Sequence, residues 1–155
     1  MEKIFKDKVA IVTGGSFGIG RAAAIAFAKR GAKVIVADWI EDSEQETLKQ
    51  IEAVGGEAIF IKSDVSKNID VKAMIEKAIS TFGRLDFAFN NAGIEGAMGQ
   101  THECTEENWD KTIGVNLKGI WLCMKHEIPV MLKQGNGAIV NCASVAGLIG
   151  FPGLP

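Results

Sequence analysis

The sequence predicts a doubly wound α/β fold with three layers, in which helices cover both faces of a parallel sheet. Short runs of β-branched and other apolar residues alternate with longer amphipathic stripes along the whole chain. The runs show no polar alternation, as expected for strands that are buried on both faces. Strands that alternate with helices form right-handed βαβ units, and such units build a parallel sheet.

The first part of the chain contains three expected strands and two expected helices. The strands are the apolar runs 8–13, 33–38 and 58–61. A helix rich in alanine over 19–30 ends at Gly31, which is the usual residue at a helix C-terminus. A second helix over 41–54 carries its apolar residues on one face and ends before two consecutive glycines.

The second part of the chain repeats the pattern. The stripe 71–82 predicts a helix that ends at Gly83, and the apolar run 85–89 predicts the fourth strand. A long helix carries a stripe over 109–128, and the residues 105–108 before it have the chemistry of an N-terminal cap. The run 137–141 predicts the fifth strand, and no repeat or linker interrupts the chain.

Composition limits the classes of function. With 155 residues, the chain has the size of one domain, covering residues 1–155. Its 17 basic and 19 acidic residues give a net charge of −2, which argues against general binding to nucleic acid or an anionic membrane. No apolar window of the roughly 18 residues that a membrane span requires is present. Three cysteines without a CxxC pattern indicate reduced thiols and a cytoplasmic protein.

The loop between the first strand and the first helix is rich in glycine and has the spacing GxxxGxG. A diphosphate needs closely spaced backbone N–H groups, and a helix N-terminus supplies them together with a favourable dipole. Glycines let the ligand approach the backbone and let the helix lie close to the strand. The loop therefore predicts a dinucleotide site in a Rossmann-like domain; the alternative is a turn that binds nothing. The residues assigned to this site are Gly14, Ser16, Phe17, Gly18, Ile19 and Gly20.

Asp38 ends the second expected strand and predicts which dinucleotide binds. A carboxylate at this place accepts hydrogen bonds from the ribose hydroxyls of the adenosine and repels a 2′-phosphate. The next residues, Trp39 and Ile40, bring no positive charge. Asp38 therefore favours NAD over NADP as the cofactor; the alternative is an ordinary polar residue at a strand end.

Taken together, these residues resemble the short-chain dehydrogenase/reductase family over nearly the whole chain. The glycine loop matches the family's cofactor signature. Asn91, Ala92 and Gly93, within Asn-Asn-Ala-Gly after the fourth strand, match a second signature beside the cofactor. Asp64 and Val65 match the pair that contacts the adenine ring. The resemblance implies an oxidoreductase that transfers a hydride between NAD(H) and an alcohol or ketone.

The resemblance also assigns two catalytic residues. Ser144 matches the family's catalytic serine, which contacts the substrate oxygen, and Asn116 matches a helix asparagine that holds a water in the proton relay. Without the resemblance, Ser144 is an ordinary loop residue and Asn116 is a helix residue bonded to solvent or backbone. Gly114 and Gly119 weaken the helix around Asn116, which predicts a local kink there.

One departure from the family is severe. The chain contains no tyrosine, so the Tyr-x-x-x-Lys pair that carries the family's proton transfer is absent. The resemblance implies that the fold is incomplete at its C-terminal side and that the chain as given is inactive. The alternative function is a non-catalytic protein that binds a dinucleotide and acts in regulation or interaction. The resemblance further implies a homo-oligomer, a dimer or tetramer; His102 and His126 have no ligand spacing, so no metal is expected.

Overall fold

The computed structural model describes residues 2–40, 44–153 and 155, and its five strands form one parallel sheet. Along the sheet the strands stand in the order β3-β2-β1-β4-β5, and every neighbouring pair is parallel. The predicted parallel sheet is therefore confirmed. The strands are β1 (Val9–Thr13), β2 (Lys33–Asp38), β3 (Glu57–Lys62), β4 (Phe87–Asn90) and β5 (Ala138–Asn141).

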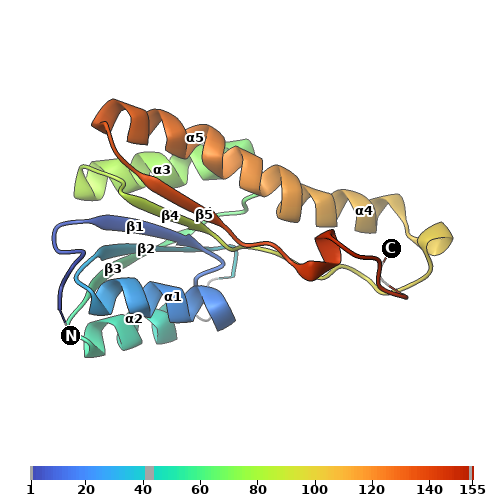
Figure 1. Cartoon of the computed structure of the whole chain (residues 1–155), viewed down its shortest axis with the longest axis horizontal. Coiled ribbons are helices and arrows are strands. Elements are labelled where there is room, and N and C mark those ends of the chain that lie inside the picture. The colour runs from blue at the N-terminus through green and yellow to red at the C-terminus, as the bar shows by residue number, and fades with distance from the viewer. Residues whose placement is uncertain (1, 41–43, 154) are drawn as a thin grey trace.

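Helices cover both faces of the sheet, as predicted for a doubly wound fold (Figure 1). One face carries α1 (Gly18–Lys29) and α2 (Glu44–Ala53), which pack against each other. The other face carries α3 (Asn68–Phe82) and α5 (Ile120–Gln134), which are also in contact. The predicted start of the second helix at residues 41–43 lies outside the described residues.

The strands bury both of their faces, which explains their continuous apolar runs. Along β2, Ile35 belongs to the cluster under α3 and α5, whereas Val34 and Val36 belong to the cluster under α1 and α2. Successive side chains of a strand point to opposite faces, so one run contributes to both clusters. On α1, the buried residues Ala24 and Ala28 are one helical turn apart and small, and they let the helix lie close to the sheet.

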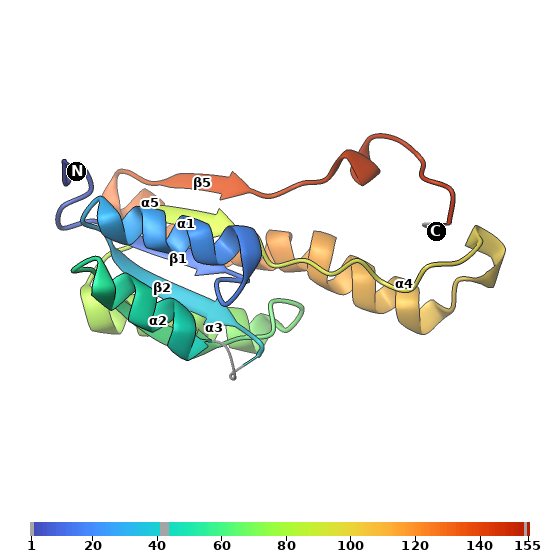
Figure 2. The ribbon, with the colours of Figure 1, turned by 90° about the horizontal axis from the view of Figure 1, so that it is seen from below.

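The long helix expected in the second part is divided into three segments. It consists of α4 (Glu106–Ile113), a π-helical segment (Gly114–Gly119) and α5. Thr105 caps α4 by accepting a hydrogen bond from the Asn108 N–H, as the sequence predicts. At the glycines where the sequence predicts a kink, the structure has the π-helical segment, in which the backbone is wider than in an α-helix. Figure 2 shows that α4 extends beyond the end of the sheet.

The apolar stripe of this helix is exposed along much of its length. Trp109, Leu117, Trp121 and Ile128 are between 43 and 65% exposed. Scattered exposed apolar residues are normal, but large ones that recur along one helical stripe are typical of an interaction surface. Pro129 lies within α5, and the helix continues past it to Gln134.

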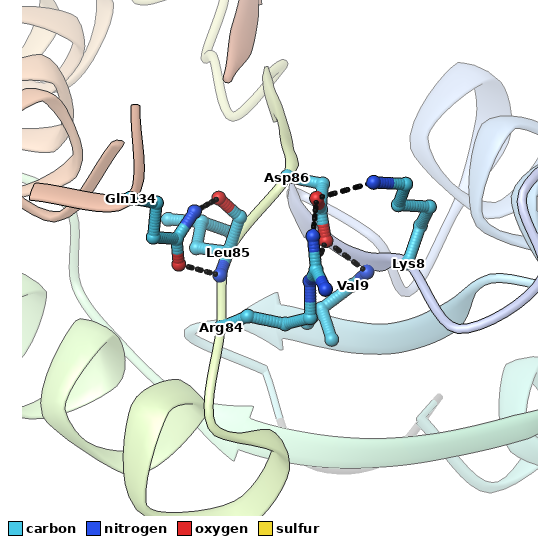
Figure 3. A network of polar contacts seen from close by, with 6 residues as sticks. All are labelled: Lys8, Val9, Arg84, Leu85, Asp86 and Gln134. Atoms are coloured by element: carbon cyan, nitrogen blue, oxygen red, sulfur yellow. Dashed lines mark hydrogen bonds and ion pairs between the residues drawn. The ribbon is translucent and has the colours of Figure 1, made fainter. Parts of the chain in front are cut away.

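Asp86 joins the amino ends of β1 and β4, where it lies beside Lys8 and Val9 (Figure 3). The glycine loop follows the carboxyl end of β1, at the opposite end of the strands. The buried Asp86 carboxylate accepts hydrogen bonds from the Arg84 guanidinium, from the Val9 N–H at 3.0 Å and from Lys8 Nζ at 3.2 Å. Burial alone would raise the pKa of Asp86, but these hydrogen bonds outweigh it and hold the pKa below its ordinary value. β4 begins two residues later than the predicted strand 85–89 and ends one residue later.

Candidate functional site

A cleft opens at the carboxyl ends of the strands, at the point where the direction of strand addition reverses. From β1 the chain proceeds to β2 and β3 on one side, and then returns to add β4 and β5 on the other side. Ligands of doubly wound sheets bind at such a switch point. The cleft has a volume of about 590 Å³, within the usual range for small-molecule sites. Nine predicted site residues line it: Gly14, Phe17, Gly18, Asp38, Asp64, Val65, Asn91, Ala92 and Gly93.

Five predicted site residues do not line the cleft. Ser16 and Gly20 are buried behind the loop, and Ile19 is exposed on its outer side. Asn116 lies in the π-helical segment close to Gly93, and Ser144 lies in the exposed segment after β5. The structure thus brings nine of the twelve predicted cofactor residues together around one cleft, and neither predicted catalytic residue, Asn116 or Ser144, lines it.

Two glycines of the loop are required by its geometry. A Cβ atom at Gly20 would lie 2.0 Å from the Gly14 carbonyl oxygen, so no side chain fits there without movement of the backbone. Gly18 has a φ of +47°, which side chains rarely adopt, and a Cβ there would meet no neighbour within 4 Å. The first turn of α1 contains no acidic residue, and among the described residues no side chain caps it. The backbone N–H groups at the start of α1 can therefore donate hydrogen bonds to a bound anion.

Asp38 is held in place at the end of β2 by backbone donors. Its carboxylate is 7% exposed and accepts hydrogen bonds from the N–H groups of Ser16 at 3.0 Å and Trp39 at 2.9 Å. The Ile40 N–H is a third donor, at 3.4 Å. A carboxylate offers about four lone-pair sites, so one remains, on Oδ2, for a ligand. The same contacts connect the glycine loop after β1 with the end of β2.

Asn91 and Thr13 connect the loops on the two sides of the switch point. The Thr13 hydroxyl accepts hydrogen bonds from the N–H groups of Asn91 and Ala92, at 3.0 and 3.1 Å. In return, Asn91 Nδ2 donates to the carbonyl oxygens of Thr13 and Gly14, at 3.1 and 3.3 Å. The glycine loop and the Asn-Asn-Ala-Gly segment are therefore one hydrogen-bonded unit.

The far end of the cleft is formed by the loop after β3. Burial alone would raise the pKa of Asp64, but hydrogen bonds from Ser66 and Lys67 outweigh it and lower the pKa, which keeps the carboxylate charged. Ser63 is 2% exposed and lines the cleft, and its hydroxyl has no hydrogen-bond partner among the described residues. A buried hydroxyl without a partner is uncommon and indicates that a ligand or water completes it.

Asn116 and Ser144 each make a local contact with the backbone. Asn116 Oδ1 accepts from the Ile94 N–H at 2.9 Å, and Asn116 Nδ2 donates to the Ile94 carbonyl at 2.8 Å. This amide pair fixes the loop after Gly93. Ser144 Oγ accepts from the Ala146 N–H at 3.2 Å, which leaves its O–H free to donate.

Sequence reasoning assigned no role to eight residues that line the cleft. Ser63 and Ser66 flank the predicted pair at 64–65, and both follow β3, so their place at a strand's carboxyl end was the available signal. Residues on α4 carried no such signal, because nothing in the local pattern shows that this helix turns toward the cleft. The eight residues are Trp39, Ile40, Ser63, Ser66, Ile94, Asp110, Lys111 and Val115.

The remaining chemistry of the described residues is limited. Among residues 2–40, 44–153 and 155, no group of three His, Cys, Asp or Glu side chains is placed to hold a metal ion. Within the same part of the chain, no helix combines the length and the apolar character needed to cross a bilayer. Burial raises the pKa of the Cys123 thiol, so this cysteine remains protonated and unreactive.

Comparison with known proteins places this site in a family. The sequence profile of the short chain dehydrogenase family matches residues 8–155. An uncharacterised oxidoreductase of Thermotoga maritima is 49% identical over 148 residues, which are 96% of this chain and 58% of the relative. The cyclohexanol dehydrogenase of an Acinetobacter species is 44% identical over 155 residues, covering 97% of this chain and 62% of the relative. The chain thus spans about three fifths of the length of these curated relatives.

Solved structures agree with the sequence comparisons. The crystal structure of levodione reductase matches with a TM-score of 0.94 and 35% identity, over 97% of this chain and 59% of that protein. A short-chain dehydrogenase/reductase from Burkholderia phymatum, solved in complex with NAD, matches with a TM-score of 0.93 and 38% identity, over 97% of this chain and 53% of that protein. With the profile match over nearly its full length, the chain belongs to the short-chain dehydrogenase family.

Proposed function

We propose that this chain forms the NAD(H)-binding part of an oxidoreductase that transfers a hydride between NAD(H) and an alcohol or ketone. The observation that carries the proposal is the joining of the glycine loop, Asp38 and the segment Asn91–Gly93 around one cleft at the switch point. When bound, the dinucleotide itself supplies or accepts the hydride. The NAD-bound relative from Burkholderia phymatum supports this choice of cofactor.

The residues of the cleft fit such a dinucleotide. The first turn of α1 and the glycines at 14 and 18 would hold the diphosphate, because they provide N–H groups and room for close approach. Asp38 would accept hydrogen bonds from the ribose of the adenosine. The unpartnered Ser63 hydroxyl would face the adenosine beside Asp64 and Val65.

Ser144 and Asn116 would act on the substrate side. The free O–H of Ser144 would donate a hydrogen bond to the substrate oxygen and polarise it. Asn116 uses one lone pair of Oδ1 for Ile94 and retains a second, which would accept from a water of the proton relay. Neither residue is acidic enough to deliver a proton, and the chain contains no tyrosine to do so.

Cofactor preference gives the first test. We expect the chain to bind NADH roughly 10–100 times more tightly than NADPH, because the Asp38 carboxylate repels a 2′-phosphate. Asp38→Ala should reduce the difference between the affinities for NADH and NADPH, mainly by strengthening the binding of NADPH. Titration of NADH and NADPH fluorescence measures both affinities. Equal affinity in the unmutated chain would contradict the role of Asp38.

Binding without turnover is the second expected result. NADH should bind to the chain, but oxidation of secondary alcohols by NAD should be undetectable, because no positioned acid or base is available for the substrate oxygen. A chimera that adds the remaining C-terminal part of the Acinetobacter cyclohexanol dehydrogenase should turn over such alcohols. In that chimera Ser144→Ala should lower kcat about 100-fold. Turnover by the unextended chain, or an unaffected Ser144→Ala chimera, would contradict this assignment.

The second candidate function is a non-catalytic protein that binds a dinucleotide and acts in regulation or interaction. A chimera that binds NADH but never oxidises an alcohol would support it.

Under either function, the exposed stripe of Trp109, Leu117, Trp121 and Ile128 supports association into a homo-oligomer. The three cysteines are free in the described structure, which supports a cytoplasmic setting.

A further inference from the structure

Thr47 lies on α2 and is fully buried, and its side-chain hydroxyl bonds to residues outside that helix. The hydroxyl accepts a hydrogen bond from Arg21 Nε at 3.0 Å. It lies 3.3 Å from the carbonyl oxygens of both Gly15 and Ser16 and donates its single hydrogen between them. Valine would fill the same space without burying a hydroxyl, so these hydrogen bonds are what distinguishes threonine at this position.

Arg21 completes the contact from the first turn of α1. Its Nη2 atom donates to the Ser16 carbonyl oxygen, which therefore has partners on two helices. The guanidinium carbon also lies 5.6 Å from the centre of the Phe17 ring, which lines the cleft. Neither Thr47 nor Arg21 lines the cleft, so both hold the loop without contributing to the cleft surface.

The loop has four consecutive carbonyl groups, and every one is held by a side chain. Those of Thr13 and Gly14 accept from Asn91, and those of Gly15 and Ser16 accept from the pair Thr47 and Arg21. All described peptide bonds are trans, so each N–H points away from the carbonyl of the preceding residue. Fixing the Ser16 carbonyl therefore fixes the direction of the Phe17 N–H at the start of α1.

We propose that Thr47 and Arg21 are positioning residues that orient the Ser16–Phe17 peptide, so that the loop presents its N–H groups to the cofactor diphosphate. This role rests on the proposed binding of NAD(H). It assigns a share in the affinity for phosphate to α2, although no residue of this helix lines the described cleft. A preorganised loop binds more tightly because it loses less freedom when the ligand arrives.

Thr47→Val tests the proposal, because it keeps the shape of the side chain and removes the hydroxyl. We expect the variant to bind ADP about 10-fold more weakly than the unmutated chain and adenosine within 2-fold of it, since only ADP carries the diphosphate. Thr47→Ser restores the hydroxyl and should return ADP binding to within 2-fold. Isothermal titration of ADP and adenosine measures each affinity. Arg21→Met, which removes the guanidinium hydrogen bonds to Thr47 and Ser16 and the contact with the Phe17 ring, provides a second variant if Thr47→Val does not fold.

Gln134→Leu is the matched control for lost stability. The Gln134 amide pairs with the N–H and carbonyl of Leu85, both at 2.8 Å, at the opposite edge of the sheet (Figure 3). This variant should lower the midpoint of denaturant unfolding and leave the affinity for ADP unchanged. An equal loss of ADP and adenosine binding in Thr47→Val, or a similar loss of ADP binding in Gln134→Leu, would overturn the positioning role.

Hydrogen exchange separates this proposal from the proposed function. Without ligand, Thr47→Val should accelerate amide exchange in residues 13–20 and leave residues 84–90 unchanged, while Thr47→Ser should match the unmutated chain. Unchanged exchange in residues 13–20 would overturn the positioning role. If the unmutated chain binds neither ADP nor NADH, the proposed function fails; if it binds both and Thr47→Val is indistinguishable from it, only the positioning role fails.

Discussion

Replacing Gly20 with alanine is expected to weaken the binding of NADH and ADP by about 100-fold or more, the effect of displacing a binding group by roughly 1 Å. The new Cβ would lie 2.0 Å from the Gly14 carbonyl oxygen and 2.7 Å from Asn91 Nδ2, whereas ordinary contacts begin at 3.4 Å. The loop must therefore move away from α1, and its contact with Asn91 breaks. Overpacking of this kind also lowers the free energy of unfolding by about 1–3 kcal/mol. Fluorescence titration and denaturant unfolding measure the two effects.

Gly114→Ala is the matched control. Gly114 lies at the start of the π-helical segment, and a Cβ added there would have the Ser66 Cβ as its nearest neighbour, at 3.7 Å. This substitution should leave ligand binding unchanged and raise stability slightly, because alanine is the better helix former. Full affinity in Gly20→Ala would show that the loop does not need its close approach to the helix.

The stability of the chain is expected to fall as the pH rises from about 4.5 to 7, because of the buried carboxyl group of Glu127. Its side chain is 0% exposed, and Oε2 accepts from Asn90 Nδ2 at 3.1 Å. Among the described residues, Glu127 Oε1 and Asn90 Oδ1 have no partner. Burial raises the pKa of Glu127 to about 7 from 4.5, and the hydrogen bond from Asn90 only partly opposes this.

The direction of the effect follows from the raised pKa. In the folded chain Glu127 keeps its proton up to pH 7, whereas in the unfolded chain it loses the proton near pH 4.5. Deprotonation therefore favours unfolding across this window, and by pH 7–8 the loss reaches about 3 kcal/mol. Glu127→Gln mimics the protonated acid and should remove this slope. Its amide can donate to Asn90 Oδ1 while its carbonyl accepts from Asn90 Nδ2.

Denaturant unfolding between pH 4.5 and 8 measures this prediction. His126 titrates in the same window, because burial lowers its pKa, but it is present in both chains and cancels in the difference between them. Glu52→Gln, an exposed change on α2, should give a curve parallel to that of the unmutated chain. Identical slopes for the unmutated chain and Glu127→Gln would show that Glu127 is charged in the folded state.

The buried strands were the most predictable part of the fold. Runs such as 33–38 are apolar on both faces because they contribute to two clusters, and that pattern is visible locally. The contact between the Asp86 carboxylate and the Val9 N–H could not be predicted, because these residues are 77 positions apart and no local pattern reports such a partner. The weak helix at Gly114 and Gly119 was predictable from composition, but its π-helical form depends on tertiary packing.

In the candidate site, a residue could be predicted from the local sequence where it directly follows or ends a strand. Asp38 could be assigned because it ends the second strand, where a dinucleotide fold places its ribose contact. The segment after β4 was assigned through the resemblance to the family. Thr47 could not, since a threonine on the buried face of a helix looks like an ordinary core residue, and its partners lie 26 to 32 residues away. Ser144 was assigned through the resemblance alone, and it lies outside the described cleft.

The position of β1 between β2 and β4 determines the order in which the binding cleft can assemble. Ile11 pairs with Ile35 on β2, only 24 residues later, whereas the contact between Val9 and Asp86 closes a loop of 77 residues. The longer closure costs about 1 kcal/mol more in chain entropy, and distant pairings of this kind slow folding. The bonds between Thr13 and Asn91 form only once β4 has docked on β1. The chain can therefore bind the nucleotide only late in folding. A bound nucleotide would stabilise the state in which β4 has docked on β1.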